Sequence, residues 1–310
     1  MLNVLFSAKP DQWDVYQAPL LAAFEQVGIS VNLSRDHAPD TVDYIIFAPN
    51  GPVTDFTPYT KARAVMSLWA GVETVADNPT LTQPLTRMVD LGLTRGMVEW
   101  VTGHVLRHHL GMDAHIMGQD GVWRDSVVPP LASQRPVTIL GLGALGTACG
   151  QALSNLGFPV TGWSRRRKNV PDIQCLHGAS GCHTALSTAS ILILLLPQTT
   201  ETTGIMSNKT LAQLPKGAVI INPGRGPLID DAALLAALDS GHIDHATLDV
   251  FNTEPLPADH PFWAHPKVTV TPHIASTTRP DTAAQTLVAN IKGHENGAPL
   301  RDTVDRQAGY

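Results

Sequence analysis

A glycine-rich hexapeptide, Gly141-Leu142-Gly143-Ala144-Leu145-Gly146, constrains the fold of this 310-residue chain more than any other feature. It directly follows the apolar run 136–140 and directly precedes a helix-compatible stretch at 147–156. In this context glycines permit a tight turn, close backbone approach to a pyrophosphate and close helix-to-strand packing, and the helix N-terminus offers free N–H groups. The flanking elements disfavour the alternative, a glycine turn without a ligand. The residues expected to bind the phosphates of a dinucleotide are Gly141, Gly143, Ala144, Leu145 and Gly146.

Short apolar runs alternate with helix-compatible stretches along the chain, which is typical of an α/β protein. Most of the runs are continuously apolar, as parallel strands covered on both faces require. The sequence predicts two doubly wound parallel-sheet domains, a Rossmann-like dinucleotide domain and a smaller flavodoxin-like substrate domain. The expected strands of the smaller domain include 4–6, 31–33 and 44–47, and those of the dinucleotide domain are 136–140, 160–163, 191–196, 218–221, 245–248 and 268–271.

The domain boundaries follow from the order of these elements. A length of 310 residues suggests about two domains. The stretch 280–295 is interpreted as a helix that crosses back to the first sheet, so we expect a discontinuous substrate domain at 1–96 and 279–310. The dinucleotide-binding Rossmann domain is expected at 97–278. A helix at 96–115 and the Gly/Pro-rich passage at 118–130 are interpreted as the connector between the domains.

Composition excludes several classes of function. The chain has 21 Lys and Arg residues against 27 Asp and Glu residues, and a net charge of −6 provides no basic field for nucleic acid or an anionic membrane surface. The most apolar run, 191–196, is far shorter than the ~20 residues of a membrane span. Three cysteines in a chain of this size indicate a reducing compartment, so a cytoplasmic location is expected.

The segment after the second strand of the dinucleotide domain predicts which cofactor is bound. An acidic residue is expected there when the cofactor has a free ribose 2′-hydroxyl, but no Asp or Glu occurs from 147 to 171. The strand is instead followed by Ser164-Arg165-Arg166-Arg167-Lys168, which can hydrogen-bond and neutralise a 2′-phosphate. The alternative is a solvated basic loop. We therefore expect NADP rather than NAD, with Ser164, Arg165 and Arg166 as contacts.

Three further segments place polar residues directly after expected strands, at the edge where open α/β sheets bind ligands. They are Asn222-Pro223-Gly224-Arg225-Gly226, the run 248–255 ending in Glu254-Pro255, and Thr271-Pro272-His273-Ile274-Ala275-Ser276. With the glycine hexapeptide and these motifs in this order, the chain resembles the D-2-hydroxyacid dehydrogenase family over essentially its whole length. It is most similar to the branch that reduces glyoxylate and hydroxypyruvate, judged also from Trp163-Ser164-Arg165, 234–241, 249–257 and Val304-Asp305-Arg306.

The resemblance implies a catalytic group of Arg225, Glu254 and His273. Hydride delivery to the keto carbon of a 2-oxo acid forms an alkoxide, which must be protonated. Histidine can donate that proton near neutral pH, and a neighbouring carboxylate favours the imidazolium and orients it. By resemblance, His273 is the acid/base and Glu254 its partner. Arg225 is implied to hold the substrate carboxylate and polarise the carbonyl, because a guanidinium stays charged and binds bidentately.

The resemblance also implies substrate contacts in the first domain. Leu68-Trp69-Ala70-Gly71-Val72-Glu73 is similar to a family loop whose backbone N–H groups bind the substrate carboxylate, which points to Ala70, Gly71 and Val72. Trp69 stands where glycine is common and Glu73 where aspartate is common, so Trp69 either narrows the pocket or packs below it. Phe47 is expected as an apolar pocket wall, with a core position as the equal alternative.

The resemblance also implies further cofactor contacts. Leu196 and Pro197 are expected beside the adenosine, and Pro223 and Gly224 near the nicotinamide ribose. Near the nicotinamide ring itself, the expected contacts are Asp249 and Ser276 at the carboxamide, with Arg225 and His273 beside the ring.

The function expected from these motifs is NADPH-dependent reduction of a small 2-oxo acid, glyoxylate or hydroxypyruvate, to the 2-hydroxy acid. Pyruvate or phenylpyruvate remain alternative substrates, and a dinucleotide-sensing regulatory protein is the alternative from another class. Oxidation of formate is disfavoured because it forms no alkoxide and needs no proton donor. The resemblance implies a homodimer formed through the dinucleotide domain and the helix near 97–110.

Two groups of possible metal ligands are not assigned to a metal site. Cys175, His177, Cys182 and His183 lie within nine residues, but their spacing is not that of a zinc finger and they are interpreted as a surface loop. His104 and His108 lie four residues apart on the expected helix. No acid is near them in the sequence pattern, so they are interpreted as part of a helix face, and no metal is expected.

Overall fold

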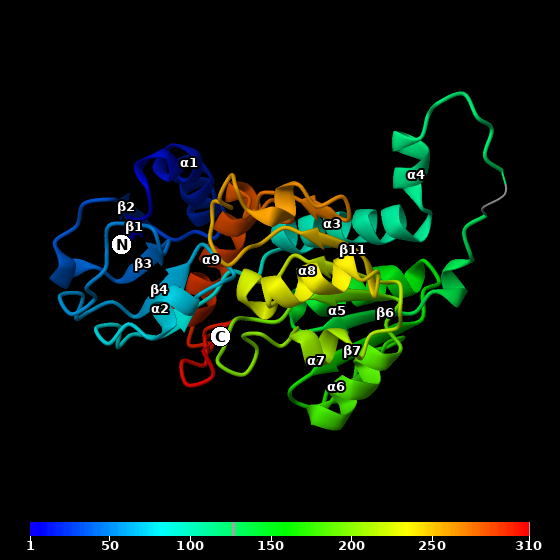
Figure 1. The fold of residues 1–310 in the computed structure, drawn as a ribbon. Helices are drawn as coiled ribbons and strands as arrows, with labels where there is room; N and C mark the ends of the chain where they lie inside the picture. The colour runs from blue at the N-terminus through cyan, green and yellow to red at the C-terminus, as the bar shows by residue number, and fades with distance from the viewer. Residues whose placement is uncertain (126–127, 310) are drawn as a thin grey trace. The chain divides into compact units, whose positions relative to one another are not determined.

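The computed structural model describes residues 1–125 and 128–309, and these form two compact units (Figure 1). The first unit comprises Met1–Leu93 and Thr277–Tyr310, and the second comprises Thr94–Ser276. Each unit contains one sheet, and the strand pairs within both sheets are parallel. The expectation of two doubly wound parallel-sheet domains is therefore confirmed.

The sheet of the first unit has the order β2-β1-β3-β4-β5, which is the flavodoxin-like arrangement. Of these strands, β4 and β5 were not among those named from the sequence. The strands are Leu2–Ser7 (β1), Val31–Ser34 (β2), Tyr44–Phe47 (β3), Ala64–Ser67 (β4) and Leu85–Thr86 (β5). The helices are Pro10–Gln26 (α1), Pro39–Thr41 (η1, 3-10), Glu73–Ala76 (α2) and Pro280–Glu295 (α9).

The C-terminal helix α9 belongs to the core of the first unit. Pro280 occupies its first turn beside Asp281, and Lys292 and His294 lie in its last turn, so its ends suit the helix dipole. Its apolar face packs with α1 and β1 in one buried cluster that includes Leu20, Phe24, Leu287, Val288 and Ile291. A chain segment nearly 200 residues beyond the first sheet thus completes that sheet's core.

The sheet of the second unit has the order β12-β11-β10-β9-β6-β7-β8. Its strands are added on one side of β6 up to β8 and on the other side from β9 onward, so the strand order reverses between β9 and β6. Such a reversal creates the crevice where dinucleotides bind in Rossmann folds. The strands are Val137–Leu140 (β6), Val160–Ser164 (β7), Gln174–His177 (β8), Ile191–Leu194 (β9), Ala218–Asn222 (β10), Ile243–Leu248 (β11) and Val268–Val270 (β12).

Helices cover both faces of this sheet. One buried cluster joins alternate strand residues to α3 and α5, and the other joins the intervening strand residues to α6, α7 and α8. The helices are Leu91–His109 (α3), Met112–Met117 (α4), Ala144–Asn155 (α5), Gly178–Ser187 (α6), Asn208–Leu211 (α7) and Asp231–Asp239 (α8). Short 3-10 helices occur at Ala132–Gln134 (η2), Gly226–Leu228 (η3) and Pro261–Trp263 (η4).

The passage 118–130 is not a connector between the units, which corrects the sequence interpretation. It lies wholly inside the second unit, because the chain passes between the units at 93–94, within α3, and at 276–277. Figure 1 shows α4 standing away from the sheet. Residues 126 and 127 of this passage lie outside the described residues.

No helix in the described part of the chain combines the length and apolarity needed to cross a membrane.

Candidate active site

The glycine turn of the second unit has the geometry of a phosphate-binding loop. It follows β6 at the point where the strand order reverses. Gly141 has a φ of 111°, and a Cβ there would lie 2.4 Å from the carbonyl oxygen of Leu195. A Cβ on Gly146 would lie 1.8 Å from the carbonyl oxygen of Gly141, so only glycine lets α5 start this close to the turn. A Cβ on Gly143 would meet nothing within 4 Å, so this exposed backbone is open to a ligand.

The first turn of α5 is suited to bind an anion. Its N-cap is Gly143, which has no side chain to bond the first helical N–H groups, and no acidic residue lies in the turn. These N–H groups have no partner within the helix, as at every helix start, and the dipole favours negative charge there. Ala144 is exposed and Leu145 half-buried, so their backbone can reach a phosphate. The residues present therefore fit the pyrophosphate of a dinucleotide.

The cationic segment after β7 folds back toward the glycine turn. The Ser164 hydroxyl donates to the carbonyl oxygen of Arg166 at 2.7 Å, which holds the start of the segment. The Lys168 ammonium donates to the carbonyl oxygen of Leu142, within the glycine hexapeptide. Arg165 and Arg166 are exposed. Positive charge therefore borders the loop that precedes α5, as a 2′-phosphate on the adenosine ribose would require.

His273 and Glu254 are in direct contact. The Nδ1 of His273 lies 2.7 Å from Oε2 of Glu254, and the other carboxylate oxygen accepts the backbone N–H of Phe251 at 2.9 Å. The two side chains are 52% and 35% exposed, so the pair lies at the surface of the second unit. This arrangement of an imidazole oriented by a fixed carboxylate can deliver and accept a proton.

Asp249 holds the loop that carries His273. Its carboxylate is fully buried and accepts the Thr271 hydroxyl at 2.6 Å and the N–H groups of Ile274 and Ala275 at 2.9 Å each. His273 has a φ of 54°, an uncommon backbone conformation for a residue other than glycine, and the bonds on either side of it fix that conformation. The sequence interpretation expects Asp249 near the nicotinamide carboxamide, and that contact remains a prediction.

Arg225 lies in the loop between β10 and η3, beside the loop of Glu254. The Asn222 amide, 1% exposed, donates to the carbonyl oxygen of Arg225 at 2.9 Å and accepts the N–H of Gly224 at 3.1 Å. A Cβ on Gly226 would lie 1.9 Å from the carbonyl carbon of Phe251, so the two loops are packed backbone to backbone. Asn222 was given no role in the sequence, although a buried amide after a strand is a signal of loop positioning.

The remaining cofactor candidates lie at the same strand ends. Pro223 and Gly224 are buried in the loop after β10, and a Cβ on Gly224 would lie 2.7 Å from the carbonyl oxygen of Leu194 at the end of β9. Leu196 is only 8% exposed and Pro197 is half-buried. Ser276 is half-buried, and a Cβ on Gly96 of α3 would lie 2.9 Å from its hydroxyl. The second unit thus gathers these residues at one edge of its sheet.

The first unit holds the predicted substrate loop between β4 and α2. Ala70 and Gly71 are half-buried and Val72 is buried. The carbonyl oxygen of Trp69 accepts the N–H of Met88 at 3.0 Å, which fixes the loop, while its side chain is 42% exposed. Phe47 is 3% exposed and its ring packs against Phe56 with centroids 5.4 Å apart. Phe47 is therefore a core residue rather than a pocket wall, the alternative that the sequence left open.

The groups set aside as metal ligands require two corrections. Cys175 and His177 lie on β8, and Cys182 and His183 lie on α6, so this segment is a strand and a helix rather than a loop. The sequence pattern of this segment is weak because β8 is a polar edge strand and α6 contains two glycines.

The histidines of α3 also differ from the sequence interpretation. An acid does lie near His108, since the carboxylate of Asp113 is close to it. Burial, with the charge of Arg107, lowers the pKa of His104 to about 4, and burial with the neighbouring His245 lowers that of His108 to about 3. Both imidazoles are therefore neutral at pH 7.

The chain is similar to proteins of a known family. The model of the family described as D-isomer specific 2-hydroxyacid dehydrogenase, NAD binding domain, matches residues 102–275. The glyoxylate/hydroxypyruvate reductase A of Salmonella newport (strain SL254) is 38% identical over 259 residues, which cover 81% of this chain and 82% of the relative.

Two solved structures are similar over the whole chain. The D-isomer specific 2-hydroxyacid dehydrogenase from Xanthobacter autotrophicus Py2, in complex with NADPH and MES, has a TM-score of 0.92 and 38% identity, covering 100% of this chain and 99% of the other. The NADPH-dependent glyoxylate/hydroxypyruvate reductase from Sinorhizobium meliloti, in complex with NADP and sulfate, has a TM-score of 0.86 and 33% identity, again covering 100% and 99%.

Proposed function

This chain belongs to the D-isomer specific 2-hydroxyacid dehydrogenase family, and on that premise we propose that it reduces a small 2-oxo acid to the 2-hydroxy acid with NADPH. The observation that carries the proposal is the 2.7 Å contact between His273 Nδ1 and Glu254 Oε2. This contact lies in the second unit, at the sheet edge that also carries the glycine turn and Arg225.

Each residue of the group has a distinct task in this reaction. NADPH, when bound, supplies the hydride that reaches the keto carbon. His273 holds the proton that the resulting alkoxide takes up, and Glu254 orients the imidazole through Nδ1. Arg225 binds the substrate carboxylate and stabilises negative charge on the carbonyl oxygen. Within the first unit, the backbone N–H groups of Ala70, Gly71 and Val72 are the proposed contacts for a carboxylate.

The cationic segment after β7 supports NADP as the cofactor. Arg165 and Arg166 are exposed, no acid occurs between 147 and 171, and Lys168 binds the glycine turn. A free ribose diol would find no carboxylate acceptor here, whereas a 2′-phosphate would find several cations. The two solved relatives that contain NADPH or NADP are in agreement.

Glyoxylate and hydroxypyruvate are the proposed substrates, in keeping with the activities for which the relatives are named. The exposed indole of Trp69 follows β4 at the start of the predicted carboxylate loop, and it would limit the space for a large substituent on the 2-oxo acid. We therefore expect glyoxylate and hydroxypyruvate to be reduced faster than phenylpyruvate.

A panel of 2-oxo acids tests the proposal. The loss of NADPH absorbance would be followed with glyoxylate, hydroxypyruvate, pyruvate and phenylpyruvate, and each would be repeated with NADH. Turnover of glyoxylate or hydroxypyruvate with a preference for NADPH is the expected result. Tight NADPH binding without turnover of any 2-oxo acid would contradict the enzyme and favour a dinucleotide sensor.

We also propose that the protein is a homodimer. Met97, Val101 and Val105 of α3 are buried against the sheet, so the helix itself does not present the apolar surface expected from the sequence. The exposed apolar residues lie further along, from the end of α3 onward. They are Leu110, Met112, Ile116, Met117, Val122, Trp123, Val128 and Leu131, here called the apolar arm. A second copy of the chain is the partner that would remove this surface from water.

A further inference from the structure

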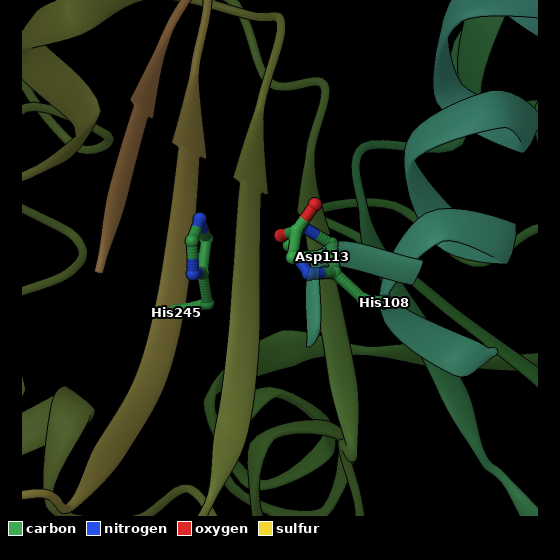
Figure 2. A group of neighbouring side chains, drawn as sticks. All are labelled: His108, Asp113 and His245. Carbon is green, nitrogen blue, oxygen red and sulfur yellow. The ribbon is translucent and has the colours of Figure 1, made fainter. Parts of the chain in front are cut away.

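Three side chains outside the proposed active site have ligand atoms close enough to hold one metal ion. They are His108 on α3, Asp113 on α4 and His245 on β11, and one ligand atom from each lies within 4.8 Å of the others. Figure 2 shows His108 and Asp113 together on the helical side and His245 on the strand. All three are half-buried, so an ion can reach them from solvent. They form the one such group of three among the described residues.

The local fold explains how these residues meet. Gly111 has a φ of 62° and lies between α3 and α4, so the chain turns sharply there. This turn returns Asp113 to the side of Arg107 and His108. His245 faces the same helix from β11, with its ring centroid 4.8 Å from that of His108. The site therefore joins a helix end to the sheet within the second unit.

Both imidazoles are already oriented by hydrogen bonds. Nε2 of His108 lies 2.8 Å from the hydroxyl of Thr247, and Nε2 of His245 lies 2.9 Å from the hydroxyl of Thr269. Histidine ligands of metals commonly use one ring nitrogen for the ion and the other for an oxygen of a neighbouring group, which fixes the ring. If both Nε2 contacts are kept, Nδ1 of each ring is the nitrogen that would bind the ion.

We propose that His108, Asp113 and His245 bind a divalent transition-metal ion of the zinc class. Two imidazoles and one carboxylate suit Zn²⁺, Co²⁺ or Ni²⁺, whereas Mg²⁺ and Ca²⁺ prefer oxygen ligands alone. Ligands about 2.1 Å from a tetrahedral ion lie about 3.4 Å apart. The three ligand atoms lie within 4.8 Å of one another, so the side chains must move closer together to bind an ion. Water would complete the coordination.

Arg107 is the competitor for this ion. Its Nε lies 2.7 Å from Oδ1 of Asp113 and its second nitrogen, Nη2, lies 2.8 Å from Oδ2. Each carboxylate oxygen keeps a further lone pair, so Asp113 can still ligate. The guanidinium nevertheless opposes a second cation nearby, and metal affinity therefore depends on Arg107.

Zinc titration by calorimetry tests the proposal on untagged protein freed of metal by chelator and dialysis. We expect one Zn²⁺ per chain, a rise in melting temperature with Zn²⁺ that Mg²⁺ does not produce, and visible absorption bands when Co²⁺ is used instead. His108→Gln, His245→Gln and Asp113→Asn should each weaken Zn²⁺ binding roughly tenfold or more. The matched control, His177→Gln with His183→Gln, removes two exposed histidines of β8 and α6 and should leave binding unchanged.

Arg107→Gln distinguishes a metal site from a purely structural cluster. It should strengthen Zn²⁺ binding by roughly fivefold or more, because the competing charge is gone. Melting of each variant without metal shows whether it is folded, and only folded variants are compared. Absence of stoichiometric binding in the wild type would overturn the proposal. So would equal losses in the control variant, or weaker binding in Arg107→Gln.

Discussion

In the loop after β12, the exposed His273 is the proposed proton donor, and the buried Asp249 holds the backbone of that loop. Asp249 has no exposed surface and accepts three hydrogen bonds from Thr271, Ile274 and Ala275, so it fixes the backbone on both sides of His273. That fixation lets His273 keep an uncommon positive φ and hold its ring against Glu254. The position of the proposed proton donor is therefore set by a residue that does not itself meet substrate.

His273→Ala tests the proton donor directly. Turnover with glyoxylate and NADPH should fall by roughly 10²-fold or more, because the alkoxide loses its proton source. NADPH affinity, measured by fluorescence titration, should change little. Glu254→Gln keeps a side chain that can bond Nδ1 but removes its charge, and it should lose less turnover than His273→Ala. Near-normal turnover of His273→Ala would remove this residue from the mechanism.

Arg165→Ala combined with Arg166→Ala tests the cofactor preference. The ratio of kcat/KM for NADPH to that for NADH should collapse, mainly through a higher KM for NADPH, because both cations are proposed contacts of the 2′-phosphate, which NADH lacks. Lys209→Ala with Lys216→Ala is the matched control, since it removes two exposed cations elsewhere in the second unit. A ratio that is unchanged in the arginine variant, or equally changed in the control, would contradict the role of this segment.

At the scale of elements, the site depends on strands that end at one edge. β10, β11 and β12 are adjacent and parallel, so the loops of Arg225, Asp249 and His273 emerge side by side. β6 carries the glycine turn to the same edge from the other side of β9. Strand order therefore brings together loops that are far apart in the sequence. The packing of these loops against one another then sets the positions of their side chains.

Gly226→Ala tests that packing. The added methyl group would lie 1.9 Å from the backbone of Phe251, so the loop of Arg225 or the loop of Glu254 must move. We expect a loss of about 1–3 kcal/mol in the free energy of unfolding and a clear fall in kcat. In Gly103→Ala, the control in α3, a Cβ meets nothing within 4 Å, and the change should be neutral or stabilise by up to about 1 kcal/mol. Full activity in Gly226→Ala would show that the contact between the loops is unimportant.

β8 and α6 were not revealed by the sequence because their patterns are weak. β9 and β10 are continuously apolar and fully buried, so their pattern is visible in the sequence. β8 is a polar edge strand that buries little, and α6 begins at a glycine, so neither has the periodicity of its class. Asp113 meets His108 only because Gly111 turns the chain, a tertiary effect that the spacing of His104 and His108 does not contain.

At the scale of the whole molecule, two self-contained sheets share one chain. Each unit has buried clusters of its own, and helix α9 returns to complete the first. The fold class was predictable because both sheets are built from buried parallel strands. The core location of Phe47 was not predictable, because a residue at a buried strand end and a residue in a pocket wall have the same apolar pattern in the sequence. Packing of the Phe47 ring against Phe56 distinguishes the two positions in the structure.

The apolar arm gathers eight exposed large apolar side chains in one segment of the described chain. Met117 and Trp123 are 86% and 88% exposed, and full burial of one such side chain contributes about 1.5–3 kcal/mol. A dimer interface that covers the arm would therefore depend on both residues. Met117→Ser combined with Trp123→Ser should convert a dimer to monomers in light-scattering chromatography while leaving the melting profile of a folded protein. Leu156→Ser, which alters an exposed leucine outside the arm, should remain dimeric. A monomeric wild type, or a double variant that stays dimeric, would show that the arm has another role.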